Sequence, residues 1–104
     1  MVYLIKQYTR KQALKEGVVV KPSTNPLKKI DVFKNGVKVA SVGGIRPNGI
    51  PYMDYPTYIQ DIGLDKANKK RRAYLARHAH EPKWRTIKGQ RVRSPSYYSD
   101  VLLW

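Results

Sequence analysis

The chain has no cysteine, seven acidic residues and no long apolar run among its 104 residues. Without cysteine it can form neither a disulfide nor a thiolate metal site, and nothing points to secretion. The longest apolar runs, residues 18–20 and 101–104, are far shorter than the ~20 residues of a membrane-spanning helix. The apolar start, residues 1–5, precedes basic residues and lacks a small-residue cleavage site. We therefore expect a soluble protein of a reducing compartment without a signal peptide or membrane span.

The scarcity of acidic residues leaves a strong positive charge. Twenty-one Lys and Arg oppose seven Asp and Glu, giving a net charge of +14, and residues 66–93 carry +10 of it. Such a one-signed surface attracts phosphates or acidic proteins. The interleaved aromatic residues suit base stacking and protein interfaces equally. The cations that we expect to bind nucleic acid or an acidic partner are Lys66, Lys69, Lys70, Arg72, Arg77, Lys83, Arg85, Lys88, Arg91 and Arg93.

Local patterns predict an α+β fold, a β-hairpin or small antiparallel sheet packed against one longer helix and one or two short helices. Residues 1–8 read as a short strand. Thr9 to Gln12 has the form of a capping box, which predicts a helix to about Glu16 that ends at Gly17. A strand over residues 18–20 and an extended arm over 21–28 follow. We therefore expect an N-terminal strand, helix and arm (1–28) and a small basic α+β domain (29–104).

The clearest local signal is Asn35-Gly36, which favours a type I′ turn between strands 30–34 and 37–42. A two-residue turn pairs Lys34 with Val37, Val32 with Val39, and Ile30 with Ser41. Two faces then follow by alternation. One holds Ile30, Val32, Val37 and Val39, and the other holds Phe33, Ala40 and Val42. Gly43-Gly44 and residues 46–49 read as loop.

Two helices are expected next. Asp54 or Tyr55 caps a short one that has Pro56 in its first turn and stops at Gly63. Asp65 caps a longer one that runs to about Ala79. On a helical wheel of this longer helix, a stripe of residues expected to be buried lies opposite a stripe of cations. The first holds Ala67, Tyr74, Leu75 and His78, and the second holds Lys66, Lys69, Lys70 and Arg77. Residues 83–98 read as a basic loop, and residues 101–104 should dock on the core.

No catalytic or metal-binding pattern emerges. His78 and His80 diverge on a helix, and few carboxylates accompany them, so we expect no metal and no other cofactor. No nucleophile elbow or phosphate-cradling glycine loop is present, so we expect neither an enzyme nor a small-molecule substrate. The sequence also lacks helix-turn-helix, zinc-finger and RNA-recognition signatures, which argues against sequence-specific readout.

Arg71 falls between Leu75 and His78 on the wheel, away from the other cations. A structural role, either as a snorkelling side chain or in an ion pair with Asp54 or Asp61, is the favoured interpretation. The alternative is a rigidly held guanidinium that grips a phosphate or carboxylate beside His78.

From Lys29 onward the ordered motifs resemble a small, uncharacterised basic protein family encoded by large (giant) DNA viruses. The matching pieces are residues 29–33, 37–42, 54–58, Gly63, Ala67, Arg71-Arg72, Tyr74, Arg77-His78, Ser94-Pro95, Tyr97-Tyr98 and 102–104. The resemblance implies a viral protein, located in the virion and in the host cytoplasm or nucleus during assembly.

Together with the basic tract, this resemblance suggests a non-enzymatic structural component of a large DNA virus particle, a minor capsid or virion-associated protein. Its partners would be other virion proteins, packaged DNA or both. The alternative is a sequence-nonspecific nucleic-acid-binding protein that acts by neutralising phosphates.

Overall fold

The computed structural model describes residues 3–104, and over them it confirms the α+β class. The strands form a three-stranded antiparallel sheet in the order β1-β2-β3 and a separate β4-β5 hairpin. The elements are α1 (Gln7–Glu16), β1 (Val19–Pro22), β2 (Lys28–Lys34), β3 (Val37–Gly44), α2 (Tyr55–Ile62), α3 (Leu64–His78), β4 (Trp84–Ile87), β5 (Gln90–Arg93) and α4 (Pro95–Leu102).

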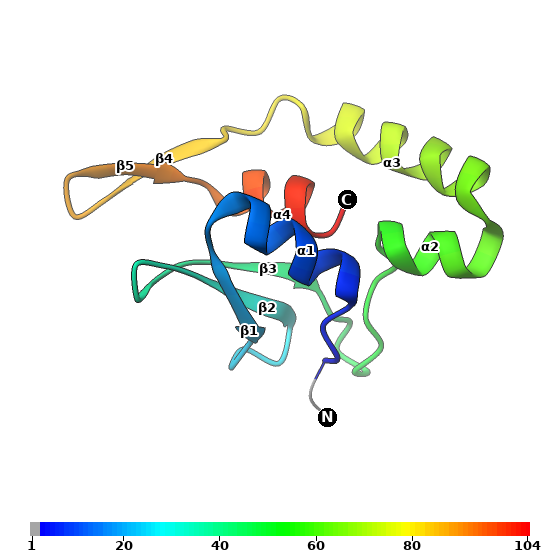
Figure 1. The fold of residues 1–104 in the computed structure, drawn as a ribbon, viewed down its shortest axis with the longest axis horizontal. Coiled ribbons are helices and arrows are strands. Elements are labelled where there is room, and N and C mark those ends of the chain that lie inside the picture. The colour runs from blue at the N-terminus through cyan, green and yellow to red at the C-terminus, as the bar shows by residue number, and fades with distance from the viewer. Residues whose placement is uncertain (1–2) are drawn as a thin grey trace.

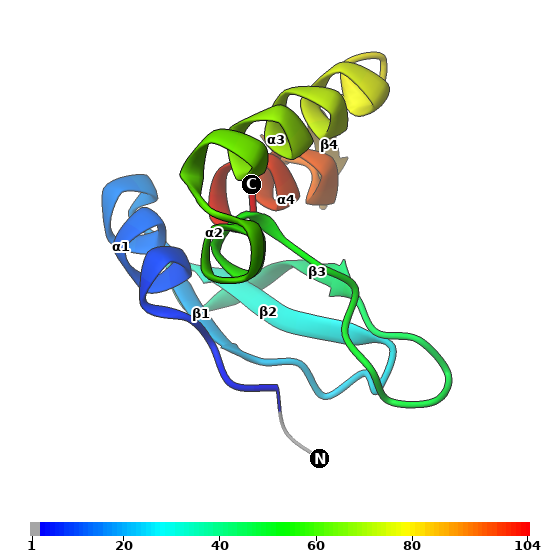
Figure 2. The ribbon, with the colours of Figure 1, turned by 90° about the vertical axis from the view of Figure 1, so that its right-hand side faces the viewer.

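The elements are layered. Figures 1 and 2 show α4 between the three-stranded sheet and α3, so α3 is the outermost helix. The β4-β5 hairpin projects from the body on the same side as the turn of β2 and β3 (Figure 1). Because one side of α3 packs inward, its other sides remain open to solvent. This arrangement displays the most basic part of the sequence.

One hydrophobic cluster joins the sheet to the helices, and the C-terminal residues lie at its centre. Leu102 and Leu103 are fully buried, and the indole of Trp104 stacks on the ring of Tyr74 with a centroid separation of 4.2 Å. The predicted docking of residues 101–104 is therefore confirmed. The backbone N–H of Tyr55 also donates to the carbonyl of Leu103, which ties the start of α2 to the end of the chain.

The N-terminal segment differs from its prediction. Residues 3–6 form no strand and α1 begins at Gln7, while Met1 and Val2 lie outside the described residues. Thr9 is inside α1 and does not cap it; its fully buried hydroxyl donates to the carbonyl of Leu102 at 2.8 Å. Burial against α4 therefore outweighs local capping. Gly17 does end the helix as predicted, in the left-handed region at φ 69°.

Residues 7–22 are part of the common core. Ala13 and Val20 are buried in it, and β1 pairs antiparallel with β2, with Val20 opposite Val32. Val18, which was predicted to start this strand, precedes it, and Lys21 and Pro22 belong to the strand rather than to an arm. Lys28, the last residue of the predicted N-terminal segment, is the first residue of β2, so the predicted boundary falls inside a strand that pairs with β1.

The β2-β3 hairpin forms at Asn35-Gly36 as predicted, with φ of 52° and 78° at the two turn residues. Lys34 pairs with Val37, but an irregularity between Val32 and Phe33 shifts the register, so Val32 pairs with Ala40 and Ile30 with Val42. The predicted pairings of Val32 and Ile30 are therefore wrong.

Such a bulge moves every later side chain to the opposite face. Directly opposed residues of an antiparallel pair share a face, so Ala40 and Val42 lie on the face of Ile30 and Val32. All four side chains are buried. The predicted division into two faces is thus wrong, and Gly43-Gly44, read as loop, extends β3.

The two central helices follow the sequence more closely. Asp54 caps α2 by accepting the N–H of Thr57 at 3.2 Å, and Gly63 ends this helix. α3 begins directly after Gly63, and Asp65 lies in its first turn without making the predicted cap. The buried stripe is confirmed in part: Ala67 is fully buried and Tyr74 packs against the core, whereas Leu75 and His78 are half-buried and lie outside the core cluster.

Candidate nucleic-acid interface

The outer side of α3 presents a basic ridge, defined here as Lys66, Lys69, Lys70, Arg72 and Arg77. All five side chains are exposed, as predicted from the wheel for four of them. The ammonium of Lys70 lies 5.7 Å from the ring centre of Tyr58 on α2, so one member also rests on an aromatic surface. Among the ion pairs within residues 3–104, none includes a member of this ridge. The ridge therefore carries uncompensated positive charge.

The acidic residues explain this lack of compensation, because five of the seven are engaged elsewhere. Those five are Glu16 with Tyr97, Asp31 with Ser23 and Ser41, Asp54 with Lys29, Glu81 with Ser96, and Asp100 with Lys83. Asp61 and Asp65 remain, near the junction of α2 and α3, and both are exposed. Internal use of carboxylates leaves a field of one sign over most of α3.

The β4-β5 hairpin lies beyond the end of α3, and it corrects the prediction of a loop over residues 83–98. Lys88 and Gly89 form its turn, with φ of 51° and 81°. Trp84 lies opposite Arg93, and the guanidinium carbon of Arg93 is 3.8 Å from the centre of the indole ring. The guanidinium carbon of Arg91 lies 4.7 Å from the centre of the same indole ring. Alternation of basic and apolar residues across two short strands holds these three side chains together.

Two predicted members of the interface bind the protein itself. The ammonium of Lys83 pairs with Asp100 at 2.8 Å and donates to the hydroxyl of Ser96 at 2.7 Å, so its charge is compensated. The guanidinium of Arg85 donates to the carbonyl of Val39 on β3. The structure thus leaves the ridge, Lys88 and Arg91 exposed and Arg93 half-buried, whereas Lys83 is half-buried with its charge paired and the exposed Arg85 makes a hydrogen bond to the body.

The two residues considered as anion-gripping groups have protein partners. Arg71 is exposed and its guanidinium lies 5.3 Å from the ring centre of Tyr55, an arrangement that fits a snorkelling side chain. The predicted ion pair of Arg71 with Asp54 or Asp61 is absent from the described residues.

His78 stacks on Tyr74 at 4.3 Å, and its Nδ1 lies 2.9 Å from Oε1 of Glu81. Contact with His78 and a hydrogen bond from Ser96 hold the pKa of Glu81 below its ordinary value. Glu81 therefore stays charged and offsets positive charge at the end of α3.

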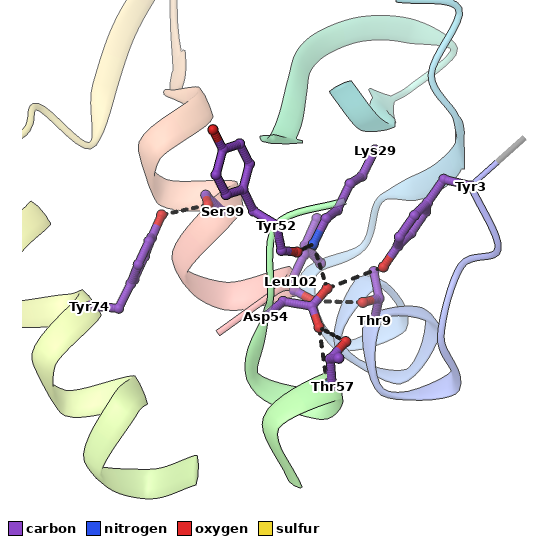
Figure 3. A network of polar contacts seen from close by, with 9 residues as sticks. All are labelled: Tyr3, Thr9, Lys29, Tyr52, Asp54, Thr57, Tyr74, Ser99 and Leu102. Carbon is purple, nitrogen blue, oxygen red and sulfur yellow. Dashed lines mark hydrogen bonds and ion pairs between the residues drawn. The ribbon is translucent and has the colours of Figure 1, made fainter. Parts of the chain in front are cut away.

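A buried polar network supports the start of α2 (Figure 3). The ammonium of Lys29 lies 2.9 Å from Oδ2 of Asp54, and their side chains are 3% and 1% exposed. Oδ2 also accepts the hydroxyl of Tyr3 at 3.2 Å, and Oδ1 accepts the hydroxyl of Thr57. Lys29 donates further to the carbonyl of Tyr52. Each charge thus has several partners, which a buried ion pair requires.

The pKa directions follow from this network. Burial lowers the pKa of Lys29, and the attraction of Asp54 opposes that effect. Burial alone would raise the pKa of Asp54, but Lys29 and the bonds from Thr57 outweigh it and leave this pKa below its ordinary value. Burial is the main cause that raises the pKa of Tyr3 far above the usual phenol value, and the nearby carboxylate of Asp54 raises it further. The pattern is that of a structural ion pair.

Asp54 was predicted from the sequence as a helix cap, but the burial of Lys29 and its ion pair with Asp54 were not predicted. The lysine precedes Ile30 in a stretch that holds three lysines within seven residues, and nothing local distinguishes it from exposed neighbours. It is buried because its aliphatic stem packs against Gly43 of β3, within reach of an Asp54 that arrives from a distant segment.

No protein-family model, no curated protein and no solved structure matches this chain. Within residues 3–104, no helix combines the length and apolarity needed to cross a membrane. The same residues hold no group of three or more metal-ligating side chains.

Proposed function

We propose that this chain is a non-enzymatic, sequence-nonspecific nucleic-acid-binding protein that neutralises phosphates with the basic ridge of α3 and the arginines of the β4-β5 hairpin. The observation that supports it best is that, within residues 3–104, no carboxylate pairs with the ridge, while most acidic residues are engaged within the fold. Unpaired cations on a convex helix can each contact a phosphate and release a counterion.

The resemblance to proteins of large DNA viruses suggests a setting for this activity. In a virus particle the ridge would bind packaged DNA, and the protein would act as a minor structural component. Leu4 and Leu14, both more than four-fifths exposed, and Val19 on the edge strand β1 are then candidate contacts with neighbouring virion proteins. These exposed apolar groups support the structural role, whereas the charge distribution supports nucleic-acid binding more directly.

The test is binding of a short DNA duplex, followed by fluorescence anisotropy over a series of salt concentrations. The first variant carries alanine at Lys69, Lys70, Arg72 and Arg77. A matched variant removes the same number of positive charges elsewhere, by alanine substitution of the exposed residues Arg10, Lys11, Lys15 and Lys21 of α1 and β1.

We expect steep salt dependence for the wild type. The ridge variant should lower the slope of log affinity against log salt by about three units, because each phosphate contact contributes about 0.9. The matched variant should lower it by less than about one unit. Equal slopes for the two variants would show that net charge alone governs binding, and would refute the ridge as the interface.

A further inference from the structure

A cavity of about 610 Å³ separates the tips of the two β-hairpins. Lys34 and Asn35 of the β2-β3 hairpin line one side, and Trp84, Lys88 and Arg93 of the β4-β5 hairpin line the other. Figure 1 shows both hairpins projecting from the same side of the body. The hydrogen bond from Arg85 to the carbonyl of Val39 connects them. The volume of this cavity is within the range of small-ligand sites, roughly 300 to 1,000 Å³.

Trp84 has no role in the core. Its indole is 42% exposed and lies outside the hydrophobic cluster, whereas Trp104 is buried within it. A large exposed aromatic residue on a projecting hairpin is a typical stacking surface for nucleic-acid bases. Arg93 is stacked between two rings, 3.8 Å from the centre of Trp84 and 4.1 Å from that of Tyr97. Flat apolar and cationic groups thus adjoin one another.

The charges that line the cavity favour an anion. Four cations contribute to its walls, Lys34, Lys88, Arg91 and Arg93, against one carboxylate, that of Glu16. Glu16 accepts the hydroxyl of Tyr97 at 2.6 Å, so its charge is partly satisfied within the protein. Val37 and Val39 supply apolar wall. A ligand with one flat ring and one phosphate matches both the stacking surface and the charge.

We propose that this cavity binds one unpaired nucleotide, with its base against Trp84 and its phosphate near Lys34 and Lys88. The inference rests on the proposed function and extends it from phosphate neutralisation to base contact. Bases in a duplex are paired and stacked, so entry requires a single strand, an unpaired end or a free nucleotide. The phosphates of duplex DNA would contact the α3 ridge and the hairpin arginines, and only a single strand would also place a base against Trp84.

The test compares four probes at one salt concentration. They are a twelve-nucleotide oligothymidylate, an abasic strand with the same number of phosphates, a short duplex and thymidine monophosphate. The variants are Trp84→Ala and Trp84→Phe. Tyr52→Ala is the control, because Tyr52 is 52% exposed and carries Arg46 at 4.8 Å from its ring centre, a similar pair at a different place.

We expect the wild type to bind oligothymidylate roughly tenfold more tightly than the abasic strand, as one base stacked on an aromatic ring provides. Trp84→Ala should remove this difference, Trp84→Phe should retain most of it, and Tyr52→Ala should leave it intact. Duplex affinity should stay within about twofold in all three variants, which also verifies that they are folded. Binding of the oligothymidylate should quench the indole emission of Trp84.

Equal affinity for the oligothymidylate and the abasic strand in the wild type would overturn the inference while leaving the proposed function intact. In that case the proposed function would still be supported if the ridge variant, but not Trp84→Ala, lost duplex binding. Thymidine monophosphate distinguishes the two sources of the nucleotide: affinity close to that of the oligothymidylate assigns the cavity to a free nucleotide, and much weaker affinity assigns it to a strand. If the wild type binds no probe, the proposed function fails as well.

Discussion

Removing one partner of the buried Lys29–Asp54 ion pair should destabilise the fold strongly, whereas removing both charges should cost less than the sum. Lys29→Met keeps the aliphatic stem that packs beside Gly43, but it leaves the carboxylate of Asp54 buried without its cation. Loss of one partner of a buried pair typically costs about 3–5 kcal/mol. Because Asp54 retains the bonds from Tyr3 and Thr57, we expect a value near the lower end, about 3 kcal/mol.

Asp54→Asn leaves an amide oxygen to accept the N–H of Thr57 but removes the countercharge of Lys29. We expect a loss of about 2–3 kcal/mol, again from a buried uncompensated charge. In the double variant neither charge remains. Its loss should therefore fall below the sum of the single losses by about 2 kcal/mol, which is within the usual range for residues in contact.

The assay is urea unfolding at neutral pH, followed by far-UV circular dichroism and by tryptophan emission. A domain of this size has a free energy of unfolding of roughly 5–15 kcal/mol, so these losses are measurable. Additive losses, or a loss under about 1 kcal/mol for Lys29→Met, would refute the view that the pair acts as a unit that holds the start of α2.

The remaining predictions concern acid sensitivity and one glycine. The pKa of Asp54 lies below its ordinary value of 3.8, so the stability gained from its charge is present above about pH 4 and lost as the pH falls further. Unfolding free energy should therefore decrease more steeply for the wild type than for Asp54→Asn between about pH 5 and pH 3, and parallel curves would contradict this. Gly43→Ala should cost about 2–4 kcal/mol in urea melts, because φ is +84° and a Cβ would lie 2.8 Å from Lys29 and 2.9 Å from Leu103. Gly49→Ala shares the strained φ, +87°, with open space around it, so it should cost about 1 kcal/mol; equal losses would refute the steric argument.

The parts of the fold that the sequence predicts are those decided by neighbouring residues. Asn35-Gly36 specifies a turn because both residues tolerate positive φ, and Asp54 with Pro56 specifies a helix start. The ridge of α3 follows from helical spacing alone. In each case a short segment carries enough information, and the tertiary structure agrees with it.

The errors arise where a distant contact overrides a local preference. Thr9 has the form of a cap, but a carbonyl of α4 takes its hydroxyl, and α1 starts two residues earlier. The bulge between Val32 and Phe33 has no marker residue, yet it moves Ala40 and Val42 to the face of Ile30. No local pattern reports such shifts, because long-range packing decides them.

The candidate interface was predicted in part. Charge density located α3, but the hairpin around Lys88-Gly89 was missed because its turn signal is weaker than Asn-Gly and its strands are rich in arginine. The ion pair of Lys83 with Asp100 was also not predicted, because Asp100 belongs to a helix, α4, whose first half was predicted to be loop. Composition identifies a basic surface, and the fold decides which cations remain free.

Nucleic acid is proposed to bind the face formed by the α3 ridge and the β4-β5 hairpin. The most direct test is to titrate the isotopically labelled protein with a short DNA duplex and follow each backbone amide by NMR. We expect shift changes concentrated in residues 64–78 and 84–93, reversed by added salt. Changes centred on α1 and β1, or a spectrum that stays unchanged at low salt, would contradict it.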